Sequence, residues 1–411
     1  MKKTCPEHGD FKSLIWEGDA KSYIRWSVQS SVNEPPVDGA PVNKGCPYDC
    51  GLCTEHLRKG CCMLLELTNR CNLHCPVCFA AAGEKEPRDL SLEEIEKQYD
   101  FLMSHGGPFN IQLSGGEPTM RDDLPEIIRL GREKGFSFFQ LNTNGIRLAE
   151  EEGYVGKLRE AGLNTVFLQF DGLNNDTYLT LRGRALLDTK GKAVDNCAAA
   201  GLGIVLVPVI AQGVNENEVG KILQFALDHM PAVRGVHFQP VSYFGRCGLD
   251  RPEKPVTIPK MLRLIEAQTD GRMKYDDFSG GGAENPYCSF HASYLRRPDG
   301  SLKPLQKRAS SCCCTTSDDS RTFVAHQWNG ESERLCLPDG EMSETSSLDE
   351  FLEQARKNTF AVSGMIFQDA YNLDLDRLRR CYICEVDAGF GMVPFCAYNL
   401  TDTEGRSLYR K

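Results

Sequence analysis

Three cysteines with the spacing Cys71-x3-Cys75-x2-Cys78 form the pattern from which a chemical function can best be inferred. They directly follow a short apolar run at residues 64–67. Three thiolates spaced in this way can bind a [4Fe–4S] cluster and leave its fourth iron without a protein ligand. Such an open position can bind a further molecule, as the open position of a catalytic zinc does. A structural zinc loop that takes its fourth ligand from elsewhere is the competing interpretation of the triplet.

A glycine-rich segment stands at the end of the next apolar run, NIQLS at residues 110–114. It consists of Gly115, Gly116, Glu117 and Pro118. Glycines allow a ligand to approach the backbone closely, and the Glu117 carboxylate could pair with an ammonium group. A tight turn before a helix is the purely structural alternative. Because the two motifs stand at the ends of consecutive apolar runs, together they favour a cluster with a small-molecule ligand over a structural zinc.

Polar side chains also stand at the ends of the next two apolar runs. Asn142 and Asn144 follow the third run, and Gln169 and Asp171 follow the fourth. These side chains could bind a ribose or a carboxylate, or shape a substrate site. Capping of the following helices is an equally open interpretation. Arg182 could pair with a ligand carboxylate or be a solvated arginine.

A second cysteine group, Cys46-x3-Cys50-x2-Cys53, repeats the spacing of the first. With Cys61, or with its neighbour Cys62, it supplies four thiolates. Four protein ligands would bind all four irons and leave no position for a further molecule, so this set predicts an auxiliary [4Fe–4S] cluster. A structural zinc is the rival interpretation.

A third group of candidate ligands lies near the C-terminus and comprises Cys381, Cys384 and Cys396. Several other cysteines are candidates for the fourth ligand of this group. Three of them are adjacent in the chain, so they could not all bind one cluster, and they could instead include a redox-active thiol. These candidates are Cys288, Cys312, Cys313, Cys314 and Cys336. We therefore expect one or two auxiliary [4Fe–4S] clusters besides the catalytic one.

Composition restricts the kind of protein. The chain of 411 residues is 41% hydrophobic and carries a formal net charge of −10. An acidic balance argues against broad electrostatic binding of nucleic acid. Without a long apolar run or an apolar stretch after the first lysines, we expect no transmembrane helix, no secretory signal and a cytoplasmic protein. Nineteen cysteines in such a chain favour metal ligation over disulfides.

Short apolar runs alternate with longer helical stretches through the middle of the chain. Ser91 and Glu94 fit a capping box at the start of one such helix. Alternation at this spacing predicts parallel βα units and an α/β fold, a partial (β/α)6 TIM-like barrel with its ligands at the C-terminal ends of the strands. The six predicted strands lie at 64–67, 110–114, 136–142, 165–170, 204–210 and 236–241.

We predict three parts: an N-terminal Cys-rich auxiliary cluster module at 1–62, the barrel at 63–245, and a C-terminal Cys-rich auxiliary module at 246–411. The last part contains two segments typical of β-hairpins, at 293–305 and 384–395. Cys197 lies on a predicted helix, where a cysteine is most often a core residue.

The motifs resemble those of the radical S-adenosylmethionine (SAM) superfamily over residues 60–245. The resemblance implies that Cys71, Cys75 and Cys78 ligate the catalytic cluster, whose fourth iron is chelated by the amino and carboxylate groups of SAM. The segment 115–118 would bind the SAM amino group. Reductive cleavage of SAM in this superfamily gives a 5′-deoxyadenosyl radical, which abstracts hydrogen from substrate. The residue before the last cysteine is usually aromatic and packs near adenine; here it is Val77, with Phe79 just after.

Longer segments resemble the tetraether lipid synthases and their shorter bacterial relatives. The similarity lies at 46–80, 366–381 and 393–400. Tetraether synthases join the terminal methyl carbons of lipid alkyl chains and have a catalytic cluster, auxiliary clusters and a rubredoxin-like iron. Cys5, in CPEHG, resembles one half of a rubredoxin knuckle, but its partner Cys-x2-Cys is missing. The shorter relatives often carry selenocysteine or adjacent cysteines.

These features together predict a radical SAM enzyme that abstracts hydrogen from an unactivated carbon and forms a C–C or C–S bond, with a lipid alkyl chain or a small molecule as substrate. We expect an external reductant such as flavodoxin or ferredoxin, and no nucleic acid partner. The alternatives are a peptide-modifying radical SAM maturase, a non-enzymatic zinc-binding scaffold and an RNA-modifying enzyme.

Overall fold

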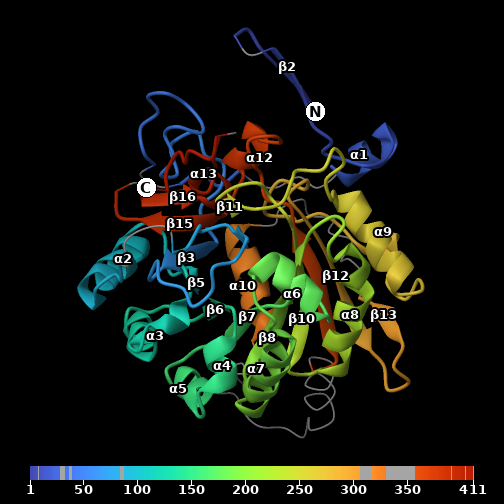
Figure 1. Cartoon of the computed structure of the whole chain (residues 1–411). Helices are drawn as coiled ribbons and strands as arrows, with labels where there is room; N and C mark the ends of the chain where they lie inside the picture. Colours follow the sequence, from blue (N-terminus) through green and yellow to red (C-terminus); the bar gives the residue numbers. More distant parts are fainter. Residues whose placement is uncertain are drawn as a thin grey trace, which may run out of the picture.

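Eight parallel strands form the centre of the molecule (Figure 1). The computed structural model describes residues 1–7, 9–27, 33–36, 39–83, 88–305, 316–329, 357–389, 391–402 and 404–410. In order across the sheet, the parallel strands are β15 (Ile383–Asp387), β3 (Cys62–Glu66), β5 (Asn110–Ser114), β6 (Phe139–Thr143), β7 (Thr165–Gln169), β8 (Gly203–Val207), β10 (Val233–Pro240) and β14 (Thr359–Met365). The six strands from β3 to β10 are the predicted ones, so the α/β barrel prediction is confirmed.

Helices connect consecutive strands and cover the outer face of the sheet (Figure 1). A parallel pair needs such a crossover, because the chain must return to the end of the sheet where it started. The capping box is confirmed: the Ser91 hydroxyl accepts from the Glu94 amide at 3.1 Å, and the Glu94 carboxylate accepts from the Ser91 amide at 2.8 Å. The crossover helices are α2 (Leu92–Ser104), α3 (Leu124–Glu133), α4 (Ile146–Glu150), α5 (Tyr154–Glu160), α6 (Asn175–Arg182), α7 (Leu187–Ala199) and α8 (Val219–Asp228).

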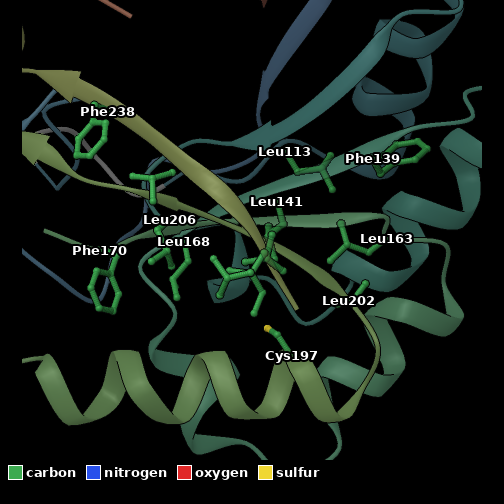
Figure 2. Packing of buried hydrophobic residues seen from close by; sticks show 14 of the residues in the cluster. Leu113, Phe139, Leu141, Leu163, Leu168, Phe170, Cys197, Leu202, Leu206 and Phe238 are labelled. Carbon is green, nitrogen blue, oxygen red and sulfur yellow. The ribbon is translucent and has the colours of Figure 1, made fainter. Parts of the chain in front are cut away.

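Successive side chains along each strand point alternately to the hydrophobic core and to the interior of the barrel. Leu113, Leu141 and Leu168 are fully buried on the side that packs against the helices (Figure 2). Figure 2 also shows Cys197 pointing from α7 toward these strands, which confirms it as a core residue. Since successive side chains point to opposite faces of a strand, the neighbours of these leucines face the interior of the barrel.

The C-terminal third of the chain contributes strands to both edges of the barrel. β14 extends the sheet beyond β10, and β15 extends it beyond β3. The connection between them, residues 366–382, therefore joins the two edges of the parallel strands and contains α12 (Leu375–Arg379). The division of the chain into three parts stays a prediction.

Both predicted hairpins are confirmed. β12 (Ser289–Arg296) pairs antiparallel with β13 (Leu302–Pro304), and β15 pairs antiparallel with β16 (Gly391–Pro394). In the first hairpin Gly300 has φ +81°, a conformation that glycine adopts without strain. α13 (Phe395–Tyr398) follows the second hairpin directly.

α10 (Ser317–Trp328) lies against the inner face of the barrel, which the sequence did not predict. Its Trp328 ring lies 4.8 Å from Phe167 and 6.2 Å from His237, measured between ring centroids. At the start of β5, the Asn110 side-chain amide donates to the Arg321 carbonyl at 3.0 Å. α10 therefore fills the end of the barrel where the strands begin and leaves space at their C-terminal ends.

The remaining elements surround this core. They are β1 (Lys2–Cys5), β2 (Gly9–Lys12), α1 (Ala20–Trp26), β4 (Val77–Cys78), η1 (Pro118–Met120), β9 (Val209–Ile210), η2 (Glu216–Glu218), β11 (Arg246–Cys247), α9 (Ile258–Gln268) and η3 (Tyr275–Asp277). β1 and β2 form a hairpin that projects from the body of the molecule (Figure 1) and contains Cys5. In the described part of the chain, no helix is long and apolar enough to cross a membrane.

Candidate active site

A cavity of about 240 Å³ opens at the C-terminal ends of the barrel strands. It collects most of the predicted site residues, although they come from four different strand ends and a helix. Those that line it are Cys71, Cys75, Cys78, Gly115, Gly116, Glu117, Asn142, Asn144, Gln169 and Arg182. Pro118 and Asp171 are buried beside the cavity and do not line it.

The three cysteines stand on a loop that the barrel holds on both sides. Cys75 packs in a small apolar cluster with Leu73 and Tyr178, and β4, which ends at Cys78, pairs with β11. Arg246 of β11 donates to the Cys75 carbonyl at 2.7 Å. Burial raises the pKa of Cys71 to about 12 and also raises the pKa of Cys75. Thiols of this kind become thiolates when a metal binds them.

The two glycines are required by a close approach of the chain to itself. The Gly116 amide donates to the Thr68 carbonyl and the Glu117 amide donates to the Arg70 carbonyl, both at 2.8 Å. A Cβ on Gly116 would lie 2.2 Å from the Arg70 carbonyl oxygen, and one on Gly115, with φ +134°, would lie 2.3 Å from that of Thr68. Approach of the loop that leads to the first cysteine is therefore one reason for these glycines, and their predicted contact with a ligand stays a prediction.

Glu117 joins the ends of two strands through its carboxylate. One oxygen accepts from the Thr119 amide, the Thr119 hydroxyl and the Thr143 hydroxyl at 2.6–3.1 Å, and the other accepts from the Asn144 amide at 2.7 Å. The side chain is buried, with an exposed fraction of 1%. This carboxylate is thus a fixed negative charge in the cavity wall, with one oxygen that can still accept from a ligand.

Lys190 is a functional residue that the sequence interpretation missed. It is fully buried on α7, and its ammonium donates to the Asn144 carbonyl at 2.5 Å and to the Gln169 side-chain oxygen at 3.3 Å. Burial lowers its pKa to about 8. Lys190 shares the buried face of α7 with Val194 and Cys197, so a lysine at an apolar helical position was the available signal.

Asp171 and Arg182 form an ion pair beneath the cysteine loop. Two guanidinium nitrogens donate to the two carboxylate oxygens at 2.7 Å, and the third donates to the Val77 carbonyl at 2.9 Å. Although burial acts in the opposite direction, Asp171 raises the pKa of Arg182, and Cys75 and Cys78 add to this effect. Arg182 is therefore not solvated, and the carboxylate predicted as a ligand contact instead positions Arg182.

The rest of the cavity wall contains polar, aromatic and aliphatic side chains, the last from residues such as Leu64, Val207 and Ile383. The polar part is made by inward-facing side chains of neighbouring strands: Gln112, Asn142, Gln169, His237 and Gln239. The aromatic part is Phe79, Phe244, Phe367 and Phe395, with Phe367 and Phe395 4.5 Å apart between ring centroids. Burial lowers the pKa of His237 to about 4, so its ring is neutral at pH 7. Of these residues, the sequence interpretation named only Asn142 and Gln169 as ligand contacts.

The first auxiliary group gathers around a second, smaller cavity. Cys46, Cys50 and Cys53 line it together with His56. Cys61, predicted as the fourth ligand, does not line it; the nearest charges that act on this buried thiol are Arg321, Glu284 and Asp318. Its amide donates to the Tyr382 carbonyl at 2.8 Å, which fixes Cys61 at the start of β3.

Three other cysteines, Cys396, Cys384 and Cys288, lie within electrostatic reach of Cys381, and the role of Cys381, Cys384 and Cys396 as cluster ligands stays a prediction. Cys384 is fully buried in the main core, whereas Cys396 belongs to a separate cluster near Cys46. Cys288 accepts from the Arg377 guanidinium at 3.4 Å, and Cys381 and Cys396 lie within electrostatic reach of Cys288. Cys312, Cys313, Cys314 and Cys336 lie outside the described residues. Within the described residues, no three His, Cys, Asp or Glu side chains could hold a single metal ion.

Comparison with known proteins identifies the family. The family model described as the radical SAM superfamily matches residues 65–226. The 7,8-dihydro-6-hydroxymethylpterin dimethyltransferase of Methanocaldococcus jannaschii is 35% identical over 449 residues, which cover 97% of this chain and 88% of that protein. The chain belongs to the radical SAM superfamily. It is therefore an enzyme that uses a [4Fe–4S] cluster and SAM.

Two further similarities are partial. The probable GTP 3′,8-cyclase of Methanothermobacter thermautotrophicus is 36% identical to this radical SAM chain over 270 residues, covering 62% of this chain and 87% of that protein. The crystal structure of Streptococcus suis SuiB bound to precursor peptide SuiA aligns with a TM-score of 0.44 at 18% identity, covering 52% and 46% of the two chains. The comparisons support the superfamily and not the narrower resemblance to tetraether lipid synthases.

The residues present fit the catalytic cluster. Three thiols line one cavity from a single loop, and the buried guanidinium of Arg182 lies within electrostatic reach of Cys75 and Cys78. A cubane bound by thiolates is anionic, so a buried positive charge beside two of the ligands favours it. Cys71, Cys75 and Cys78 would hold the cluster at the mouth of the barrel.

We predict that Gly116→Ala destabilises the site, because the added Cβ would force the two hydrogen-bonded backbone segments apart. The expected loss is about 2–3 kcal/mol in the free energy of unfolding, with a matching loss of iron after anaerobic reconstitution. Gly191→Ala in α7 is the control, since a Cβ there meets no atom within 4 Å. Equal behaviour of the two variants would contradict the role of the close approach.

We predict that Asp171→Asn leaves Arg182 buried without its carboxylate and costs about 3–5 kcal/mol of stability. Affinity for SAM should fall too, as the cysteine loop loses its support at Val77. Thermal unfolding and equilibrium dialysis with SAM measure the two effects. Glu93→Gln, which removes the exposed ion pair with Lys97, should change neither, and a comparable loss in both variants would refute the assignment.

We predict a pH dependence that comes from Lys190. Its pKa is about 8 in the folded protein, against the ordinary lysine value of 10.5 that applies when the chain unfolds, so between these values the unfolded chain binds more protons. Stability should therefore rise as pH increases from 8 to 10, by up to about 3 kcal/mol from this residue. The difference between wild type and Lys190→Met in urea unfolding isolates the contribution; a pH-independent difference would contradict it.

Proposed function

We propose that this enzyme functionalises a carbon atom of a small, flat nitrogen heterocycle of the pterin or purine kind, with formation of a C–C bond. The cluster held by Cys71, Cys75 and Cys78 would supply the electron that cleaves SAM and generates the 5′-deoxyadenosyl radical, which abstracts hydrogen from this substrate. A one-electron reductant such as flavodoxin or ferredoxin would reduce the enzyme.

The composition of the cavity wall carries the proposal. Gln112, Gln169 and Gln239 each present a primary amide, which offers a donor and an acceptor side by side. The edge of a pterin or guanine ring presents the complementary pair. The wall also contains aromatic side chains, and aromatic rings stack on flat heterocycles. An alkyl chain offers no hydrogen-bonding group to the polar side chains of this wall, whereas a nitrogen heterocycle does.

The names of the relatives agree with this substrate class. The M. jannaschii protein is named for a reduced pterin, and the M. thermautotrophicus protein is named for GTP, which contains guanine. Both ring systems contain a fused pyrimidine with amide-like edges. Since the first relative aligns with nearly all of this chain and is named a dimethyltransferase, methylation of the heterocycle is the C–C bond-forming reaction that we expect. Hydrogen abstraction would leave a ring-carbon radical, a methyl donor would supply the new carbon, and one electron from the external reductant would balance the release of the spent donor.

Different residues of the cavity would bind SAM and the substrate. Glu117, fixed by its hydrogen bonds, would accept from the SAM ammonium group, and Asn142 and Asn144 would bind polar groups of SAM. Lys190 would hold Asn144 and Gln169 in place from below. His237, whose Nδ1 lies 2.9 Å from the Ser363 hydroxyl, is neutral and so could bind a ring nitrogen of the substrate without charging it.

Transfer of deuterium tests the proposal. The reduced enzyme is incubated with SAM and, in separate reactions, with deuterated 7,8-dihydro-6-hydroxymethylpterin, deuterated GTP, and lipids with perdeuterated chains. Mass spectrometry of 5′-deoxyadenosine should find deuterium with a heterocycle and none with the lipids. Gln239→Leu should reduce this transfer by about tenfold or more, while Gln224→Leu, on the outer helix α8, should not.

The other outcomes distinguish the alternatives. Deuterium from lipid chains alone would refute the heterocycle and favour the tetraether-type reaction. Unlabelled 5′-deoxyadenosine with every probe would refute both and turn the search to a peptide substrate. Equal transfer in wild type and Gln239→Leu would contradict the role of the amide wall.

A further inference from the structure

We propose that Cys46, Cys50, Cys53 and His56 form a Cys3His site for an auxiliary [4Fe–4S] cluster, in which His56 takes the place that the sequence spacing assigns to Cys61. The site is separate from the catalytic cavity, and the inference does not depend on the substrate proposed above. It concerns only which residues of this chain bind the second cluster.

The four side chains share one cavity. Cys46, Cys50, Cys53 and His56 line it together, with Leu52 and Leu378 as its apolar wall. The exposed fraction is 8% for Cys53 and 4% for His56, so both ligands would be shielded from water. Cys61 does not line this cavity. All four proposed ligands therefore lie within the segment from 46 to 56.

The hydrogen bond of His56 leaves the correct nitrogen for a metal. Nε2 lies 2.7 Å from the Cys381 carbonyl oxygen. A carbonyl can only accept, so Nε2 carries the proton and Nδ1 presents its lone pair. Histidine ligands in metal sites nearly always donate their other N–H to a carbonyl or carboxylate, which fixes the ring and its tautomer. The Cys381 carbonyl provides this second contact.

Hydrogen bonds hold the loop that carries the cysteines. One Asp49 oxygen accepts from the backbone amides of Asn43 at 2.7 Å and Gly45 at 2.6 Å, and from that of Lys44. The Tyr409 hydroxyl donates to the Pro47 carbonyl at 2.6 Å and accepts from the Cys50 amide at 2.8 Å. These contacts hold the cysteine loop against the C-terminal part of the chain, so the positions of the candidate ligands are fixed.

A positive charge also faces the cavity. Arg379 of α12 lines it and pairs with Glu55 at 2.9 Å. A cluster with three thiolates and one neutral imidazole carries one negative charge fewer than a cluster with four thiolates, and one guanidinium suits it.

Pulsed EPR tests the proposal on the full-length chain. Cys71, Cys75 and Cys78 are replaced by alanine so that the catalytic cluster gives no signal, and the protein is reconstituted, reduced and compared with and without ¹⁵N-histidine. We expect a nitrogen coupling typical of an iron-bound imidazole, and ¹⁵N-histidine should change it. Intact iron content without such a coupling would overturn the proposal, and this measurement needs no change at His56.

Substitutions distinguish His56 from Cys61. His56→Cys should keep the iron, lose the nitrogen coupling and shift the reduction potential to more negative values, because a thiolate replaces a neutral imidazole. His56→Ala should abolish the nitrogen coupling and lower the iron content, because the fourth iron loses its protein ligand. Cys61→Ala and the control His105→Gln should preserve both iron and coupling. Loss of one cluster in Cys61→Ala with retention in His56→Ala would establish the alternative ligand set.

Discussion

The close approach of two backbone segments, Thr68–Arg70 and Gly115–Glu117, determines the geometry of the catalytic cavity. Each segment follows a neighbouring parallel strand, and two hydrogen bonds at 2.8 Å join them where neither position 115 nor 116 has space for a Cβ. This contact places the first cysteine directly beside the Glu117 carboxylate. Glu117 in turn binds the end of β6 through Thr143 and Asn144. One constraint on side-chain size therefore aligns three strand ends and the cysteine loop.

Buried charges extend this alignment around the barrel. Glu117, Lys190 and the pair Asp171–Arg182 lie beneath successive strand ends, and each is joined by hydrogen bonds to backbone groups of the loops above it. Burying such groups costs free energy unless their partners are fixed. Because these partners are backbone atoms, the loops cannot move without leaving a charge unpaired. Glu117, which would accept from the SAM ammonium group, thus also fixes the shape of the cavity wall.

The sequence predicted the parts of the fold that depend on local pattern. The six barrel strands, the capping box at Ser91 and both hairpins follow from periodicity and turn chemistry, and the cysteine loop, the Gly115–Glu117 segment and Asn144 were found because they stand at strand ends. His237 and Gln239 were missed, since only the curvature of the sheet brings them to the cavity. Lys190, which lies on α7 behind the cavity residues Asn144 and Gln169, was missed although its apolar helical position was a signal. The burial of Cys384 in the core depends on contacts between distant segments, which spacing along the chain does not encode. The helix α10 inside the barrel was missed for the same reason. His56, by contrast, stands three residues after Cys53, so its spacing was available in the sequence and was not used.

The position of β15 has a consequence for the order in which the chain acquires its structure. β3 is the first strand of the barrel to be synthesised, yet its outer neighbour pairs Ile383 with Cys62. Until that late segment leaves the ribosome, one edge of the nascent barrel presents unpaired backbone groups, which is a template for aggregation. The cysteine loop follows this edge directly. Early assembly of the iron–sulfur centre would tie down the loop next to the open strand, so a supply of iron and sulfide during synthesis would protect the growing chain as well as activate the finished one.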